Sequence, residues 1–208
     1  LDLGDIYLIK GEPWESTLLY SQVEKMQREN PVGYEAKLKN AKLSYFKGDF
    51  RLAQEHLDIL KEATTREIAN DAMNLSMLIK ENIAFDSVGE ALKHFASVEL
   101  LLYQNKTTDA LEKIQKLKQG IGDSTTFSNQ AILDDVYWLE ARIRLEEGKF
   151  QESISLLQKI TSDFTDDVLG DDAWFMQAEI YDRYIKDKTK AMDMYREFLN
   201  KFPGSVFA

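Results

Sequence analysis

The sequence predicts an all-α protein: a solenoid of about eleven helices, stacked as antiparallel hairpins. Two observations carry this prediction. Apolar residues recur at helical spacing along most of the 208 residues, and only three prolines interrupt them. A short motif of turn residue, aromatic residue and small residue also recurs along the chain, at intervals typical of stacked helical hairpins.

The motif is clearest in the stretch "GDFRLAQEHLDIL", residues 48–60. Gly48 is expected to adopt the left-handed conformation that ends the preceding helix, residues 34–47. Asp49 is expected to cap the amides of the next helix. Ala53 is small, which indicates that the two helices approach closely at this point. The second helix has one apolar stripe, formed by Phe50, Ala53, Leu57 and Leu60.

Looser copies of the motif predict four further turns. The five turn positions are residues 11, 48, 105, 148 and 187, separated by 37, 57, 43 and 39 residues. The interval of 57 residues is about one helix too long, and we assign the excess to a helix at 66–85. The polar segment 119–130, with two glycines, is predicted to be the longest linker.

These elements predict a single superhelix over residues 1–208, with three sub-blocks. The sub-blocks are 1–65, an irregular block at 66–120 that contains the extra helix, and 128–208. A solenoid closes with a helix whose outer face is polar, and neither end of this sequence shows one. We therefore expect a fragment of a longer array.

The composition excludes several classes of function. The net charge of −10 and the scattered basic residues have the wrong sign for a nucleic-acid-binding surface. No apolar run approaches eighteen residues, so no membrane-spanning helix is predicted. The absence of cysteine excludes disulfides, thiol nucleophiles and cysteine metal sites.

Polar residues that stand out are better explained by structure than by chemistry. The paired acids lack the alternation of a calcium loop and are predicted to cap helices and to complement the helix dipole in the first turn: Asp134–Asp135, Asp166–Asp167 and Asp171–Asp172. Glu90 and His94 lie one turn apart, but two ligands are too few for a metal site, and His56 stands alone. No nucleophile motif or phosphate loop is present. The sequence predicts a non-catalytic protein with no cofactor and no metal.

The stretch "WFMQAEIYDRY…KAMDMYREFLNKFPGS" resembles the tetratricopeptide repeat, and "LGDIY" near the start is similar to it as well. The resemblance covers most of the chain, but residues 66–90 fit poorly, and repeats two and three lack the large aromatic usual early in the first helix. The signature positions are held by Trp174, Ala178, Tyr181, Ala191, Tyr195, Phe198 and Pro203.

The joint "VLGDDAWFMQAEIYD" and the ending of the chain resemble bacterial cell-envelope repeat proteins. These include the Tol-Pal cell-division coordinator and outer-membrane assembly lipoproteins, and the chain looks most like large repeat proteins of the Bacteroidetes. This resemblance implies a periplasmic or cell-envelope location, with the cytoplasm still open.

In the tetratricopeptide family the first helices of successive hairpins line a concave groove that binds a protein or peptide. The resemblance implies twelve groove-facing residues, which we call the predicted concave face. Trp138 and Phe175 could instead pack between hairpins. The predicted concave face consists of Leu38, Lys42, Tyr45, Phe46, Asp135, Trp138, Arg142, Leu145, Asp172, Phe175, Glu179 and Asp182.

The function expected from this resemblance is a non-catalytic scaffold that binds a protein or peptide partner of unidentified sequence. The lysine-and-asparagine clamp that some family members use for C-terminal carboxylates is not matched. Two alternatives stay open. The chain could be a helical accessory region of a larger envelope enzyme, or the groove could be filled by neighbouring segments of the same protein.

Overall fold

The structure is a computed structural model that describes residues 1–61, 65–85, 89–122, 130, 132–164 and 168–208. All regular secondary structure in these residues is helical, with eleven α-helices and one short π-helix. The predicted all-α fold of about eleven helices is confirmed. The chain divides into two compact units, Leu1–Ala131 and Ile132–Ala208, which are described separately.

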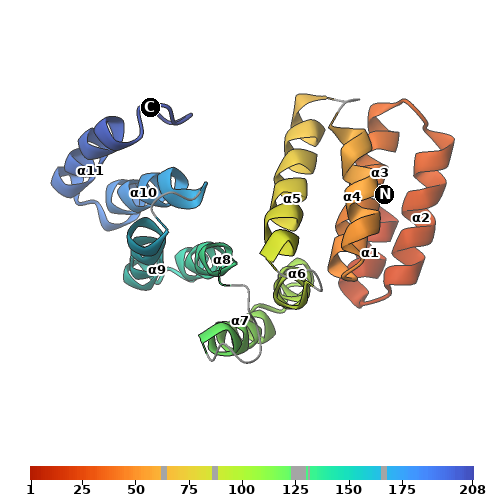
Figure 1. Ribbon diagram of the computed structural model, residues 1–208, viewed down its shortest axis with the longest axis horizontal. Helices are drawn as coiled ribbons and strands as arrows, with labels where there is room; N and C mark the ends of the chain where they lie inside the picture. Colours follow the sequence, from red (N-terminus) through yellow and green to blue (C-terminus); the bar gives the residue numbers. More distant parts are fainter. Residues whose placement is uncertain (62–64, 86–88, 123–129, 131, 165–167) are drawn as a thin grey trace. The chain divides into compact units, whose positions relative to one another are not determined.

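Unit 1 contains three helical hairpins and one additional helix. Hairpin partners contact each other, and α5 packs on α4 and also contacts α3 and α6. Figure 1 shows α2, α4 and α5 upright, with α6 and α7 nearly end-on. The additional helix has the predicted bounds. The helices are α1 (Asp2–Lys10), α2 (Pro13–Met26), α3 (Pro31–Phe46), α4 (Phe50–Leu60), α5 (Arg66–Phe85), α6 (Glu90–Tyr103) and α7 (Thr107–Gly122).

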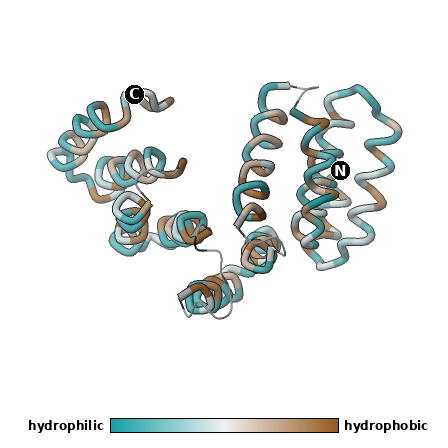
Figure 2. The backbone as a smooth tube through the Cα atoms, in the orientation of Figure 1, coloured by the Kyte–Doolittle hydropathy of each residue, from teal (hydrophilic) through white to brown (hydrophobic). Residues whose placement is uncertain are grey.

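Unit 2 contains two hairpins whose helices share one core. Figure 2 shows hydrophobic residues recurring along each helix, as an amphipathic helix requires. The core includes Ala141, Ile154, Leu157, Ile160, Ala173 and Ile180. The helices are α8 (Leu133–Glu146), α9 (Phe150–Asp163), α10 (Leu169–Glu179), the π-helix η1 (Ile180–Ile185) and α11 (Lys188–Lys201).

Each hairpin turn contains one left-handed residue, and a small residue follows it five positions later. The left-handed residues are Gly11, Gly48, Asn105, Gly148 and Lys186, with φ between 58° and 85°. The small residues are Ser16, Ala53, Ala110, Ser153 and Ala191, all buried. The five-residue interval therefore sets where the two helices of each hairpin touch.

The fifth turn differs from the prediction by one residue. Lys186, and not Asp187, adopts the left-handed conformation, with φ 66°. Asp187 is the N-cap of α11, and its Oδ1 accepts a hydrogen bond from the Lys190 amide at 3.0 Å. Sequence reasoning placed the turn at Asp187 because lysine is rarely left-handed and carries no turn signal.

The π-helix η1 accommodates one extra residue in the last hairpin. Ala41 and Ala53 are twelve residues apart, as are Ala141 and Ser153, whereas Ala178 and Ala191 are thirteen apart. A π-turn adds one residue without rotating the helix that follows. Ala191 therefore still faces the first helix, where it is buried in the unit 2 core.

Two further predictions need correction. Residues 119–122, predicted as the start of a linker, form the last turn of α7, and residues 123–129 lie outside the described part of the chain. Asp134–Asp135 and Asp171–Asp172 lie in the first turns of α8 and α10, but the N-cap positions are Ile132 and Val168. These acids thus complement the helix dipole without capping the helix. Asp166–Asp167 lie outside the described residues.

The described helices were also compared with the length and hydropathy that a membrane span requires. None of them is both long enough and apolar enough to cross a bilayer.

Candidate functional site

Two residues of the predicted concave face in unit 1 are core residues. Leu38 is 6% exposed and Tyr45 is 1% exposed. The Tyr45 hydroxyl donates a hydrogen bond to Glu99 Oε2 on α6 at 2.6 Å. This face of α3 is covered by α5 and α6, which both contact α3. Leu38 and Tyr45 therefore do not lie on an open groove, because the extra helix and the next hairpin pack where a groove was expected.

The other two residues of this group also contact neighbouring helices. Lys42 donates to Asp71 Oδ2 on α5 at 3.1 Å. Phe46 is half-buried, and its ring centroid lies 6.3 Å from that of Tyr103 on α6. The sequence could not show that α5 and α6 cover this face of α3.

The predicted residues of unit 2 are more exposed. On α8, Arg142 is exposed and Asp135 is half-buried, whereas Trp138 and Leu145 pack against the unit 2 core. On α10, Glu179 pairs with Arg183 at 2.8 Å. Arg142 therefore remains the most accessible member of the predicted concave face on α8.

Phe175 on α10 is enclosed by aromatic rings of its own unit. Its ring is stacked on Phe207 with centroids 4.4 Å apart, and it also meets Tyr195 at 5.7 Å and Phe198 at 5.6 Å. Nearby, Asp182 pairs with Lys188 at 2.6 Å. Burial and the neighbouring Asp171 carboxylate raise the pKa of Asp172.

A different groove lies in unit 1, on the opposite face of α3. It has a volume of about 830 Å³, with α3 as its floor and α2 and α4 as its walls. We call it the α3 groove. It is lined by Trp14, Thr17, Ser21, Glu24, Lys25, Arg28 and Glu29 from α2 and the turn after it, by Gly33, Tyr34, Lys37, Asn40, Leu43, Ser44 and Lys47 from α3 and its C-cap, and by Asp49, Leu52, His56 and Ile59 from α4 and its N-cap.

The α3 groove exists because three floor positions carry small or polar side chains. Relative to the small residue at the helix contact, Lys37, Asn40 and Ser44 stand at −4, −1 and +3 from Ala41. The same positions relative to Ala178 of α10 hold a tryptophan, a glutamine and a tyrosine: Trp174, Gln177 and Tyr181.

In unit 2 the corresponding side chains fill the space between the helices. Trp174 donates from Nε1 to the Met194 carbonyl at 3.1 Å, and its ring meets Phe202 at 6.4 Å. On α8, the positions at −1 and +3 from Ala141 hold Glu140 and Arg144, which form an ion pair at 3.5 Å. The groove on α3 thus reflects a local loss of large side chains.

A polar cluster crosses the floor of the α3 groove. Glu24 forms an ion pair with Lys37 at 2.5 Å and accepts a hydrogen bond from Asn40 Nδ2 at 3.0 Å. Burial alone would raise the pKa of Glu24, but the hydrogen bonds from Lys37 and Asn40 hold it below its ordinary value. Glu24 therefore stays charged and fixes the orientation of the Asn40 amide.

Asn40 has one unused hydrogen-bonding atom. The residue is 6% exposed, and within the described part of the chain its Oδ1 accepts no hydrogen bond. A buried acceptor without a partner costs about 1–3 kcal/mol. The floor of the groove therefore contains an acceptor that a bound N–H group would satisfy.

His56 faces the same cluster from α4. Burial lowers the pKa of His56, and Lys37 acts in the same direction, while Glu24 and Glu55 oppose the shift. His56 is thus neutral at pH 7 and adds no positive charge to the groove. Within the described residues, no three histidine, aspartate or glutamate side chains gather as a metal site requires.

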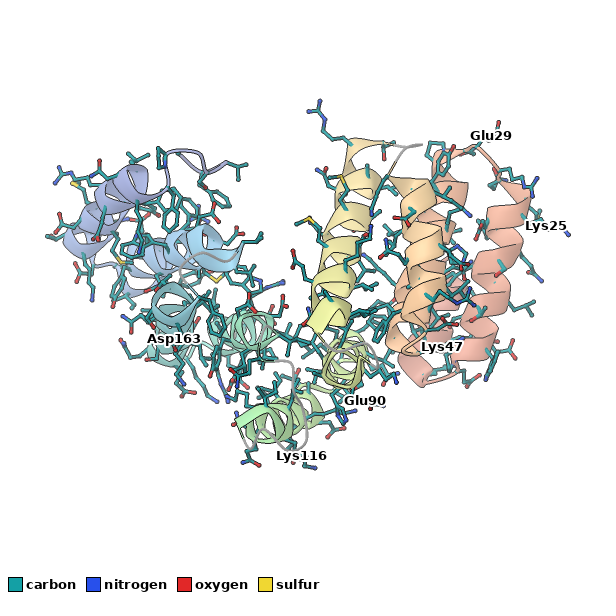
Figure 3. The ribbon with its side chains drawn as sticks, in the orientation of Figure 1. Lys25, Glu29, Lys47, Glu90, Lys116 and Asp163 are labelled. Carbon is teal, nitrogen blue, oxygen red and sulfur yellow. The ribbon has the colours of Figure 1, made fainter. Side chains whose placement is uncertain are left out.

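The end of the α3 groove near the α1–α2 turn carries an exposed aromatic ring. Trp14 is 78% exposed. Lys47 lies 4.6 Å above its ring and donates to Thr17 Oγ1 at 2.9 Å. Burial lowers the pKa of Lys47. Figure 3 shows Lys47 and Glu29 at opposite ends of the helices, so the groove extends along α3.

Sequence reasoning missed the α3 groove, although one signal pointed to it. The second repeat lacks a large aromatic early in its first helix, where Lys37 stands. A missing large side chain at a contact position leaves space between the helices.

The comparisons with known proteins give one match. No curated protein and no solved structure matches the chain. The match spans one helical hairpin: residues 172–205, in α10, η1 and α11, match the model of the tetratricopeptide repeat family.

Proposed function

We propose that the chain is a non-catalytic scaffold that binds a peptide segment of a partner protein in the α3 groove. Tetratricopeptide repeats generally mediate protein interactions, and the last hairpin matches that family. The α3 groove supplies a place for a ligand, because its volume of about 830 Å³ lies in the range of ligand-binding clefts.

One observation carries the proposal: the α3 groove is open where the equivalent positions in unit 2 are filled. Lys37, Asn40 and Ser44 stand at positions where Trp174 and Tyr181 pack against neighbouring helices of α10. A spacer would gain stability from filling such a trough, because buried apolar area stabilises a fold. Leaving it open is expected when a ligand completes the packing.

The rim of the groove has the residue types of binding hot spots. Tryptophan, tyrosine and arginine dominate the energetics of protein interfaces. Trp14, Tyr34 and Arg28 all line the α3 groove. The walls are rigid, because α2 and α4 each pack along α3, so little order is lost on binding.

The test is a selection of peptides on the full chain. A displayed random-peptide library should yield binders to the wild-type chain that fail to bind Ser44→Tyr, because tyrosine at this position fills the floor as Tyr181 of η1 does in unit 2. Ser155→Tyr, the same substitution at an exposed position of α9, is the matched control and should retain them. If every selected peptide binds Ser44→Tyr as well as wild type, the α3 groove is not the binding site.

The unit 2 residues of the predicted concave face remain a second proposed contact surface, centred on Trp138 and Arg142 of α8. If the selected peptides fail to bind Trp138→Ala but still bind Ser44→Tyr, the binding site lies on that face. We also propose a periplasmic or cell-envelope location, supported by the resemblance of "VLGDDAWFMQAEIYD" to joints of envelope repeat proteins. Cell fractionation with an antibody against the chain tests the location.

A further inference from the structure

We infer that the ligand of the α3 groove is an acidic peptide of about six residues bound in an extended conformation. This inference rests on the proposed function and adds the shape and charge of the peptide to it. Three features of the groove support it: its dimensions, the balance of its charges and the state of the Asn40 amide.

The dimensions favour an extended peptide. The floor extends from Gly33 to Lys47, a rise of about 21 Å along an α-helix. An extended chain advances about 3.4 Å per residue, so about six residues span this length. An extended hexapeptide therefore spans the floor of the groove from end to end.

The charges favour an acidic peptide. The chain as a whole has 36 acidic and 26 basic residues, yet Lys25, Arg28, Lys37 and Lys47 outnumber the carboxylates in the groove. In the described part of the chain, neither Lys25 nor Arg28 forms an ion pair. These two cations stand ready to pair with carboxylates of a ligand.

The carboxylates of the groove are largely engaged already. Glu24 is paired with Lys37, and Asp49 accepts the Leu52 amide as the N-cap of α4. On the outer side of α4, Glu55 pairs with Arg51 at 2.7 Å. Glu29, at one end of the groove, is the carboxylate that opposes an acidic ligand. The charge available to a ligand is therefore mainly positive.

Asn40 provides a contact to the backbone of the peptide. Its Nδ2 is held by Glu24, whereas its Oδ1 lacks a partner. Oδ1 is covered in the free chain, so a small shift of the side chain, with the hydrogen bond from Nδ2 to Glu24 retained, is needed for it to accept an N–H of an extended peptide. Because this contact is made to the peptide backbone, it does not depend on the peptide sequence. The preference for acidic residues therefore comes from Lys25 and Arg28.

The experiment measures binding of three fluorescein-labelled hexapeptides to the full chain by fluorescence polarisation. Leucine alternates with aspartate, asparagine or lysine in the three peptides. We expect the aspartate peptide to bind at least tenfold more tightly than the other two. Its affinity should also fall between 50 and 300 mM NaCl, because salt screens the attraction between exposed charges. Equal binding of all three would overturn the inference.

Two variants assign the effect to the groove. Lys25→Ala with Arg28→Ala should weaken the aspartate peptide at least fivefold and leave the asparagine peptide unchanged. Lys10→Ala with Lys116→Ala removes the same charge from exposed positions outside the groove and should change neither. Both pairs replace exposed side chains, so folding is retained. A loss in the second pair equal to that in the first would overturn the inference.

Further outcomes separate the inference from the proposed function and from other occupants. Selected peptides that lose binding in Ser44→Tyr but are neutral or basic would refute the acidic preference and leave the proposed function standing. Absence of any such peptide would refute the proposed function itself. A bound peptide that becomes helical by circular dichroism would overturn the inference. A dimer of the chain in light scattering that Ser44→Tyr dissociates would do the same.

Discussion

The hydroxyl of Ser153 donates a hydrogen bond to the carbonyl oxygen of Ala141 at 2.8 Å. It joins the second helix of a hairpin to the first, at the point where they are closest. Ser16 makes the same bond to Gly4 at 2.8 Å in the first hairpin. In the other hairpins alanine stands at this position, so the position requires a small side chain and accepts serine when its hydroxyl is bonded.

Enlarging this contact should destabilise the fold. Ser153→Leu should lower the free energy of unfolding by about 1–3 kcal/mol, because the added atoms are forced into a packed core. Ser153→Ala should cost about 1 kcal/mol or less, since it removes only one hydrogen bond. Ser155→Leu, at an exposed position of the same helix, is the control and should change little. Urea unfolding measures all three, and equal losses at both leucine positions would contradict the close contact.

Substitutions at two left-handed turn residues should change the free energy of unfolding in opposite directions. Lys186→Gly should raise the free energy of unfolding by about 0.5–1 kcal/mol, because glycine adopts positive φ without steric cost. Gly148→Ala should lower it by about 1 kcal/mol, since it places a Cβ on a residue with φ 75°. Thermal unfolding followed by circular dichroism checks both. A stabilising Gly148→Ala would contradict the assigned turn conformation.

Because η1 holds one extra residue, we expect unit 2 to tolerate the deletion of one residue from it. Removing Arg183 should convert η1 to a regular α-turn and retain a cooperative unfolding transition, because Ala178 and the small residue of α11 are then twelve residues apart. Removing Arg142 from α8 shortens a regular twelve-residue interval and rotates the rest of the helix by about 100°. This second deletion should abolish cooperative unfolding, as circular dichroism during urea titration would show. Equal tolerance of both deletions would contradict the conclusion that η1 accommodates one extra residue.

A half-buried carboxylate in unit 1 makes stability depend on pH. Asp5 on α1 accepts hydrogen bonds from the Tyr20 hydroxyl at 2.6 Å and from Lys39 Nζ at 3.0 Å. Burial alone would raise the pKa of Asp5, but these hydrogen bonds outweigh it and the pKa lies below its ordinary value of 3.8. Burial and the same carboxylate raise the pKa of Tyr103 to about 12.

A lowered pKa in the folded state means that the unfolded chain binds the proton first on acidification. The stabilisation from Asp5 is therefore complete above about pH 4 and is lost as the pH falls through the folded pKa. Asp5→Asn should lower the free energy of unfolding by about 1–3 kcal/mol at pH 7, and the difference from wild type should shrink toward pH 2. Urea unfolding between pH 2 and 7 measures this. Asp193→Asn, at an exposed position, should show no such trend.

Most of the architecture follows from the sequence, because the signals for a hairpin are local. Gly48 and Asp49 specify a turn and a cap, and Ala53 specifies a contact five residues after the turn. The helix at 66–85 was predicted from spacing alone and has those bounds. The turn at Lys186 was misplaced at Asp187 because lysine carries no turn signal, and no side chain marks the π-turn of η1.

The candidate site was predicted less well, because it depends on what packs above a helix face. Tyr45 was predicted to face an open groove, but it is buried against α6. The α3 groove arises from side chains that are absent at contact positions. A pattern search finds the residues that match a repeat, whereas Lys37 and Ser44 matter here because they depart from it.

The constant distance between turn and small residue has an evolutionary consequence. These two sites recur in every described hairpin, whereas the residues at −4, −1 and +3 of the first helix differ between repeats. A lineage could open, close or recharge a recess in one repeat by three substitutions, as the contrast between Lys37 and Trp174 illustrates. Ligand preference in such arrays can then change repeat by repeat while the backbone stays the same.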